Sequence, residues 1–100
     1  MADASSILLF NEEARQRAFA MFTVYVLYSE QYDKIYIGYT SNLEARLKSH
    51  QELSTKGWTV KFRPWKLIHT EIFEKKTDAM RREKQLKTAK GREFIWQLIH

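Results

Sequence analysis

The chain has 100 residues, 44% of them apolar and 14% aromatic, which is enough for one domain with one core and too few for two. Its net charge of +5 indicates a negatively charged partner, most commonly nucleic acid, and the absence of cysteine excludes disulfides, zinc ribbons and thiol catalysis. No apolar run approaches a membrane span of about 20 residues, and the run at residues 7–10 is too short for a signal peptide, so we expect a cytoplasmic protein that contacts no membrane.

Residues 1–20 differ in charge from the rest of the chain. They carry three acidic and two basic residues, a net charge of −1, whereas residues 21–100 carry 15 basic and 9 acidic residues, a net charge of +6. We therefore expect residues 1–20 to be an N-terminal extension, either a short amphipathic helix over about Ser6–Phe19 or a disordered segment. Residues 21–100 should form the folded, basic domain.

The first half of this domain predicts a hairpin followed by a helix. Phe22–Ser29 is rich in β-branched and aromatic residues, and Lys34–Gly38 has the same character after a short polar turn, so the two segments should pair as strands. Apolar residues occupy both parities of these strands, which indicates a sheet that is covered on both faces. Ser41 and Glu44 form a capping box, which predicts a helix from Asn42 to about Gln51.

The second half predicts one more strand and two helices. After a loop over residues 53–65, Lys66–Phe73 reads as a third strand, and a helix capped by Thr77 should run through Lys87. Gly91 should separate it from a last helix, Arg92–Ile99, whose side chains are mostly core. The expected fold class is α/β (α+β), a small three-stranded mixed or antiparallel sheet flanked by helices in the order β-β-α-β-α-α.

Four polar residues in the first half could carry chemistry. Tyr25 and Tyr36 lie in the two hairpin strands and could converge on one face of the sheet, although strand tyrosines more often serve only packing. Arg46 and His50 are four residues apart, so they should lie one turn apart on the same side of the helix. The plainer interpretation is an exposed arginine and a histidine placed at the helix end by the helix dipole.

Glu83 is the candidate in the second half. It falls three or four residues from Ala79 and Leu86, which places it on the inner stripe of its helix. A carboxylate on such a stripe needs a partner, and two are open at this point: a metal ion, or a structural salt bridge with Arg46.

A basic segment surrounds Glu83. Residues 75–92 contain eight lysines and arginines against two acidic residues, which favours a phosphate-binding surface over a merely solvated helix face. The candidate nucleic-acid contacts are Lys75, Lys76, Arg82, Lys84 and Lys87.

These motifs together resemble those of the GIY-YIG endonuclease superfamily. The strand TVYV carries Tyr25, and KIYIG carries the second motif with Tyr36 eleven residues later. The segment SNLEARLKSH resembles the arginine-bearing helix of the family, with Arg46 and His50, and TDAMRREKQLK resembles its glutamate helix, with Glu83. The similarity covers about residues 21–91 and is greatest to the small stand-alone bacterial branch, in which the nuclease domain is the whole protein.

The resemblance departs from the family pattern at three residues. Thr23 and Val24 stand where the first motif has glycine and isoleucine, which the stand-alone branch tolerates. Tyr39 follows the second motif at a place where the repair-nuclease branch has a lysine, so a lysine-assisted mechanism is not expected.

The resemblance implies a Mg²⁺-dependent DNA endonuclease, with Mn²⁺ as an alternative metal and DNA repair or recombination as the setting. Glu83 would anchor the metal, and Arg46 would hold a phosphate oxygen. Tyr25 or Tyr36 would accept the proton of water if its pKa of about 10 were lowered, and His50 would relay that proton or orient the tyrosine.

Two other functions stay open at this point. One is a non-catalytic nucleic-acid-binding module on the same fold, and the other is a protein-interaction domain that uses the tryptophan-containing loop, residues 53–65. The sequence predicts no small-molecule cofactor, and it does not separate DNA from RNA, duplex from branched substrates, or one oligomeric state from another.

Overall fold

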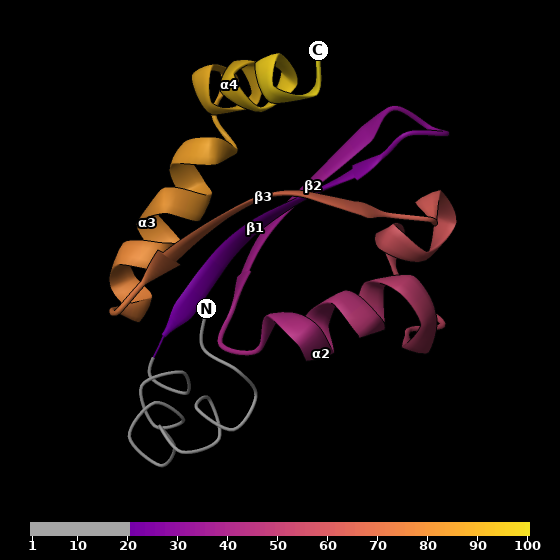
Figure 1. The fold of residues 1–100 in the computed structure, drawn as a ribbon, viewed down its shortest axis with the longest axis horizontal. Coiled ribbons are helices and arrows are strands. Elements are labelled where there is room, and N and C mark those ends of the chain that lie inside the picture. The colour runs from indigo at the N-terminus through magenta and orange to yellow at the C-terminus, as the bar shows by residue number, and fades with distance from the viewer. Residues whose placement is uncertain (1–20) are drawn as a thin grey trace, which may run out of the picture.

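Strand β1 (Phe22–Ser29) is the centre of a three-stranded sheet in the computed structural model, which describes residues 21–100 (Figure 1). β2 (Lys34–Thr40) and β3 (Lys66–Phe73) pair with its two edges, and both pairings are antiparallel. The predicted element order and strands are thus confirmed, with a sheet that is antiparallel rather than mixed. The predictions for residues 1–20 lie outside the described residues.

One face of the sheet packs against the two C-terminal helices, α3 (Lys76–Leu86) and α4 (Ala89–Ile99). Alternate residues of β1 and β2 point to this face, because successive side chains of a strand point to opposite sides. They form the larger core with small and aliphatic residues of the two helices. Its buried members are Val24, Val26, Ile35, Ile37, Ala79, Leu86 and Ile95.

The opposite face carries the segment between β2 and β3 (Figure 1). This segment contains the short helix α2 (Leu43–Lys48), a π-helical turn (Ser49–Leu53) and a 3₁₀ turn (Trp58–Phe62). The buried core on this side consists of Tyr25, Leu27 and Trp65. Both faces of the sheet are therefore covered, which explains why the strands are apolar at both parities.

The start and end of α2 differ from the prediction. Asn42, not Ser41, is the N-cap, and its side-chain oxygen accepts a hydrogen bond from the Ala45 backbone N–H at 3.1 Å. The α-helical geometry ends at Lys48 instead of continuing to Gln51, and the chain goes on as the π turn.

The boundary between α3 and α4 also differs from the prediction. No side chain caps the start of α3, so Thr77 is not its cap. The helices separate at Thr88, whose hydroxyl accepts from the Gly91 N–H at 3.2 Å, so Gly91 lies inside the first turn of α4. A Cβ atom at Gly91 would overlap the backbone of Gln85 and Leu86, and close approach of the helices therefore requires glycine there.

Helix α4 is less buried than predicted. Ile95 is its buried residue, while Phe94 and Leu98 are exposed, so the helix is amphipathic rather than mostly core. Across residues 21–100, no helix combines the length and the apolar character needed to cross a bilayer.

Candidate active site

A cleft of about 400 Å³ opens where β1 and β2 meet the helices α2 and α3. Its walls include Tyr25, Tyr36, Arg46 and Glu83, four of the five residues that the sequence singled out. They come from four different elements, and the fold brings them to one place. The lining also contains Lys76 and the polar chain segment at the end of β2, which gives the cleft a mixed but mainly positive character.

The fifth residue, His50, lies behind the cleft and contacts Tyr25. The Tyr25 hydroxyl and His50 Nε2 are 2.9 Å apart, which is hydrogen-bond distance, and His50 Nδ1 is 3.2 Å from Thr59 Oγ1. Tyr25 has no exposed surface and His50 is 7% exposed, so the two side chains form a buried polar chain. The His50 ring also lies against Tyr36, with ring centroids 4.7 Å apart.

The π turn that carries His50 is held by side chains from the following loop. The Arg63 guanidinium donates to the backbone carbonyls of His50, Ser49 and Ser54, at 2.6, 3.0 and 2.7 Å. The Gln51 side chain bonds both the N–H and the carbonyl of Trp65. The Arg63 bonds satisfy carbonyls that an ordinary helix end leaves unpaired, and the Gln51 bonds tie the π turn to Trp65.

Sequence reasoning missed two residues of this assembly, Thr59 and Arg63. Both lie in the predicted loop, and both act through contacts that span nine or more positions in the chain. Neither has a spacing or a motif that points to the site, so the sequence contains no signal that would have found them.

The environment of Tyr25 opposes loss of its proton. Burial raises the pKa of Tyr25 to about 12, and the Arg46 guanidinium nearby offsets only part of this effect. The Tyr25 hydroxyl in turn raises the pKa of Arg46, which stays a cation. The sequence interpretation required a lowered tyrosine pKa, and the described residues by themselves give the opposite. A proton acceptor next to Tyr25 therefore becomes important.

His50 has the properties of such an acceptor. Burial lowers the pKa of His50 below its ordinary value of 6.5, and the positive charges of Arg46 and Arg63 lower it further. The imidazole is thus neutral at pH 7, and one of its nitrogens carries a lone pair. His50 can accept a proton from the Tyr25 hydroxyl if that lone pair is on Nε2.

Gly38 provides the space that Tyr25 occupies. It lies opposite Tyr25 in the β1–β2 register, in the extended part of the strand. A Cβ atom at Gly38 would lie 2.7 Å from the Tyr25 hydroxyl oxygen and 2.8 Å from Cζ, closer than real Cβ contacts allow. The glycine of the second motif is therefore needed here for room beside the tyrosine, rather than for a tight turn.

Glu83 faces the cleft with a 22% exposed side chain. Its ion-pair partner within residues 21–100 is Lys87, the C-cap residue of α3, at 3.5 Å. The alternative of a structural salt bridge between Glu83 and Arg46 is therefore wrong. The carboxylate keeps a side open to the cleft.

The side chains that line the cleft fit a divalent cation that binds one carboxylate and takes its other ligands from water and phosphate oxygens. No group of three or more acidic or histidine side chains gathers anywhere in the described part of the chain, so a fully protein-made metal cage is absent there. Mg²⁺ does not need one, because it commonly binds one or two carboxylates and completes its shell with water and substrate phosphate. Glu83 provides the carboxylate for such an arrangement.

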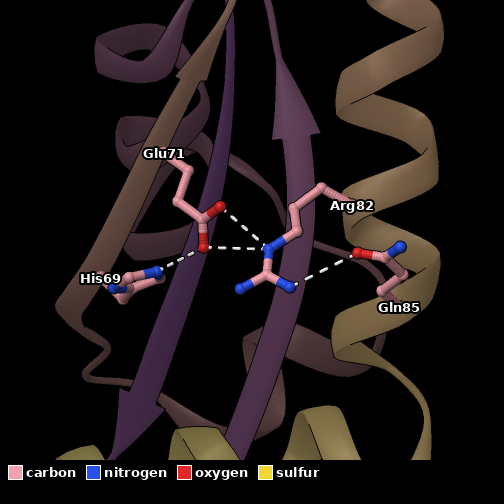
Figure 2. Close-up of polar contacts among 4 residues, drawn as sticks. All are labelled: His69, Glu71, Arg82 and Gln85. Carbon is pink, nitrogen blue, oxygen red and sulfur yellow. Dashed lines mark hydrogen bonds and ion pairs between the residues drawn. The ribbon is translucent and has the colours of Figure 1, made fainter.

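The basic residues on α3 and directly beside it differ in exposure and in ion pairing. Lys75, Lys76, Lys84 and Lys87 are exposed. Arg82 instead reaches across to β3, where its Nε lies 2.9 and 3.1 Å from the two carboxylate oxygens of Glu71, as Figure 2 shows. Glu71 also bonds His69 at 2.7 Å. Arg82 thus has a structural ion pair in addition to its predicted contact with nucleic acid.

The tryptophans of residues 53–65 have different surroundings. Trp65 is 4% exposed and belongs to the core, where its indole N–H donates to the Thr59 carbonyl at 2.7 Å. Trp58 is 47% exposed and lies against Phe62 and Tyr36. A protein-interaction surface on this loop would therefore have one accessible tryptophan, not two.

Comparisons with known proteins identify the family of the chain. A family model described as the GIY-YIG catalytic domain matches residues 21–95. The chain is similar to a UPF0213 protein of Staphylococcus haemolyticus, with 41% identity over 56 residues, which cover 56% of this chain and 68% of the relative. It is also similar to a UPF0213 protein of Natronomonas pharaonis, with 38% identity over 65 residues, which cover 65% of this chain and 75% of the relative.

One solved structure also matches most of this chain. The solution NMR structure of a UPF0213 protein from Bacillus halodurans is 29% identical to this chain, with a TM-score of 0.48, and the match covers 78% of this chain and 84% of that one. The family assignment rests on the match of the family model to residues 21–95. The chain belongs to the GIY-YIG family.

Proposed function

We propose that this protein is a metal-dependent endonuclease that hydrolyses phosphodiester bonds in DNA. The observation that carries the proposal is the cleft itself, in which Tyr25, Arg46 and Glu83 meet and His50 contacts Tyr25 from behind. A module that only binds nucleic acid has no use for a carboxylate next to the phosphate, because its charge opposes binding. The combination favours hydrolysis over binding alone.

Arg46 and Lys76 would bind the scissile phosphate. Both line the cleft, and the guanidinium of Arg46 presents a planar set of donors that suits two phosphate oxygens. Their positive charges also stabilise the negative charge that grows on the phosphate oxygens as water attacks phosphorus. These two residues therefore position the substrate and lower the barrier.

Tyr25 and His50 would remove the proton of the attacking water. With a pKa of about 12, Tyr25 does not exist as a tyrosinate in advance, so its own proton must leave as it takes one from water. His50 Nε2, at 2.9 Å, receives the Tyr25 proton, while the Tyr25 oxygen receives that of water. The P–O bond to the leaving oxygen then breaks, and that oxygen takes a proton from solvent. The hydrogen bond to His50 favours Tyr25 over Tyr36 as the general base, although Tyr25 is fully buried and Tyr36 is the more accessible of the two cleft tyrosines.

Glu83 would hold the divalent cation, Mg²⁺ or Mn²⁺, together with water and phosphate oxygens. When bound, the cation would supply positive charge next to the phosphate. Before it binds, the Lys87 ammonium at 3.5 Å partly balances the Glu83 charge. Glu83 lies on α3 and Lys87 is the C-cap of that helix, so the basic side chains that would contact the DNA backbone lie on or directly beside the helix that carries the carboxylate.

A cleavage assay tests the proposal. Labelled duplex, flap and single-stranded DNA and a matched RNA should be incubated with the full chain in Mg²⁺, Mn²⁺ or EDTA. We expect metal-dependent cleavage of DNA that EDTA abolishes, and binding that weakens as salt rises because basic residues displace counterions.

Two other results would support other functions. Salt-dependent binding without cleavage of any substrate would indicate the non-catalytic binding module. Affinity that does not depend on salt would favour a protein-interaction domain.

A further inference from the structure

We infer that Thr59 is a positioning residue that sets the tautomer of His50, so that the lone pair of the imidazole faces Tyr25. The catalytic role of this tautomer rests on the proposed nuclease function, but the tautomer itself can be measured without any cleavage. Thr59 lies in the 3₁₀ turn between β2 and β3, outside every motif of the family resemblance. Its hydroxyl oxygen is 3.2 Å from His50 Nδ1.

The two nitrogens of His50 cannot both carry a proton while the ring is neutral. If Tyr25 is to donate its proton to Nε2, that nitrogen needs a free lone pair, and the ring proton must be on Nδ1. Nδ1–H then needs an acceptor, because an unpaired buried donor is costly. Among residues 21–100, the side-chain oxygen that fills this need is that of Thr59.

Arg46 also favours the arrangement in which the Tyr25 hydroxyl donates to His50 Nε2. Its guanidinium can only donate, and it lines the same cleft as Tyr25, where it can engage a lone pair of the hydroxyl oxygen. The hydroxyl proton of Tyr25 is then left to point toward His50, 2.9 Å away. A His50 ring with its proton on Nε2 would require the Tyr25 hydroxyl to rotate and accept from that nitrogen.

The position of the Thr59 hydroxyl is fixed by its surroundings. Thr59 is 9% exposed, and its carbonyl accepts from the Trp65 indole N–H at 2.7 Å. The backbone of Trp65 is in turn bonded by Gln51, one residue after His50. The turn that carries Thr59 and the turn that carries His50 are thus linked through Trp65, which holds the hydroxyl oxygen near Nδ1.

Two substitutions separate the hydroxyl from the shape of the side chain. Thr59→Val keeps the branched shape and removes the oxygen, while Thr59→Ser keeps the oxygen and removes a methyl group. The first measurement is the ¹⁵N NMR spectrum of the histidine rings at pH 8, with His50 assigned by the loss of its signals in His50→Gln. Amide spectra of both variants check that the fold is retained.

We expect the parent and Thr59→Ser to carry the proton on Nδ1, and Thr59→Val to move most of it to Nε2. The second measurement is the single-turnover cleavage rate at saturating DNA, which should fall by about 10- to 100-fold in Thr59→Val and stay within about threefold of the parent in Thr59→Ser. DNA affinity should be the same in all three proteins, since Thr59 does not line the cleft.

The NMR result decides the inference whether or not the parent cleaves DNA. A parent with the proton on Nε2, or a Thr59→Val variant that keeps it on Nδ1, would overturn it. A parent that cleaves nothing but shows the expected tautomer change would refute the nuclease function and leave the role of Thr59 standing. If Thr59→Val fails to fold, a Thr59→Ser variant with the proton on Nε2 would overturn the inference.

Discussion

Replacing Gly38 with alanine should disrupt the contact between Tyr25 and His50, because the new methyl group needs the space that the Tyr25 ring occupies. The added Cβ would lie 2.7 Å from the Tyr25 hydroxyl oxygen, 2.8 Å from Cζ and 3.1 Å from a ring carbon of Tyr36. Tyr25 is fully buried and hydrogen-bonded, so its ring cannot swing aside into solvent. Either the strands or the tyrosine must shift.

The free energy of unfolding should fall by about 1–2 kcal/mol. Overpacking of this kind costs about 1–3 kcal/mol. The lower entropy of unfolded alanine relative to glycine returns about 0.5–1 kcal/mol, because the strand geometry at Gly38 suits any residue. For a domain of this size, each 1 kcal/mol corresponds to a melting-temperature change of about 4–8 °C. The cleavage rate should fall further than stability explains, because the Tyr25 hydroxyl no longer meets His50.

Gly91→Ala is the matched control. Its Cβ would overlap the backbone at the end of α3, so this variant should lose at least as much stability while the Tyr25–His50 pair stays intact. Urea unfolding and cleavage by the folded fraction separate the two effects. A Gly38→Ala variant as stable and as active as the parent would refute the reasoning, and so would equal activity losses in the two variants.

Three further predictions test separate parts of the site and its support. The folded-state pKa of His50 lies below the ordinary 6.5, so as pH falls the unfolded chain binds the proton first. Below pH 6.5, stability should then drop by at most about 1.4 kcal/mol per pH unit in urea titrations, and His50→Gln should remove that slope. Glu71→Gln should cost about 1–2 kcal/mol, since it breaks the partly buried pair with Arg82, whereas Asp78→Asn, at the exposed pair with Arg81, should change stability by less than about 0.5 kcal/mol. Arg46→Ala should leave stability within about 0.5 kcal/mol and lower the cleavage rate by about 10²- to 10³-fold, and an unfolded variant would show that Arg46 is structural.

The strands and the convergence of the tyrosines were predictable because they depend on local pattern and on the period of two. β1 and β3 have the predicted bounds. β2 begins at Lys34 as predicted, and it ends at Thr40, two residues after the predicted end at Gly38. Tyr25 and Tyr36 meet on one face with ring centroids 6.1 Å apart. If the two segments pair as a hairpin, the alternation of side chains along the strands places both tyrosines on the same face.

Helix ends and long-range polar contacts could not be predicted in the same way. Ser41 and Asn42 are both good N-caps, and the choice depends on how the chain leaves β2, where Thr40 Oγ1 accepts from the Asn42 N–H. The pairing of Arg82 with Glu71 depends on where α3 crosses β3, which no spacing encodes. The raised pKa of Tyr25 arises from burial, and burial follows only from the complete fold.

The most direct test of the nuclease account is the cleavage rate of Glu83→Gln in Mg²⁺. The amide keeps the size of the side chain and removes the charge that would hold the cation. Because the only ion pair lost within the described residues is the weak one with Lys87, stability should change by less than about 0.5 kcal/mol. Glu93→Gln, which makes the same charge change on the exposed surface of α4, is the control.

We predict that Glu83→Gln binds DNA at least as tightly as the parent and does not cleave it, while Glu93→Gln does both normally. A Glu83→Gln variant that cleaves DNA at the rate of the parent would contradict the account, because the metal would then not depend on the one carboxylate that lines the cleft.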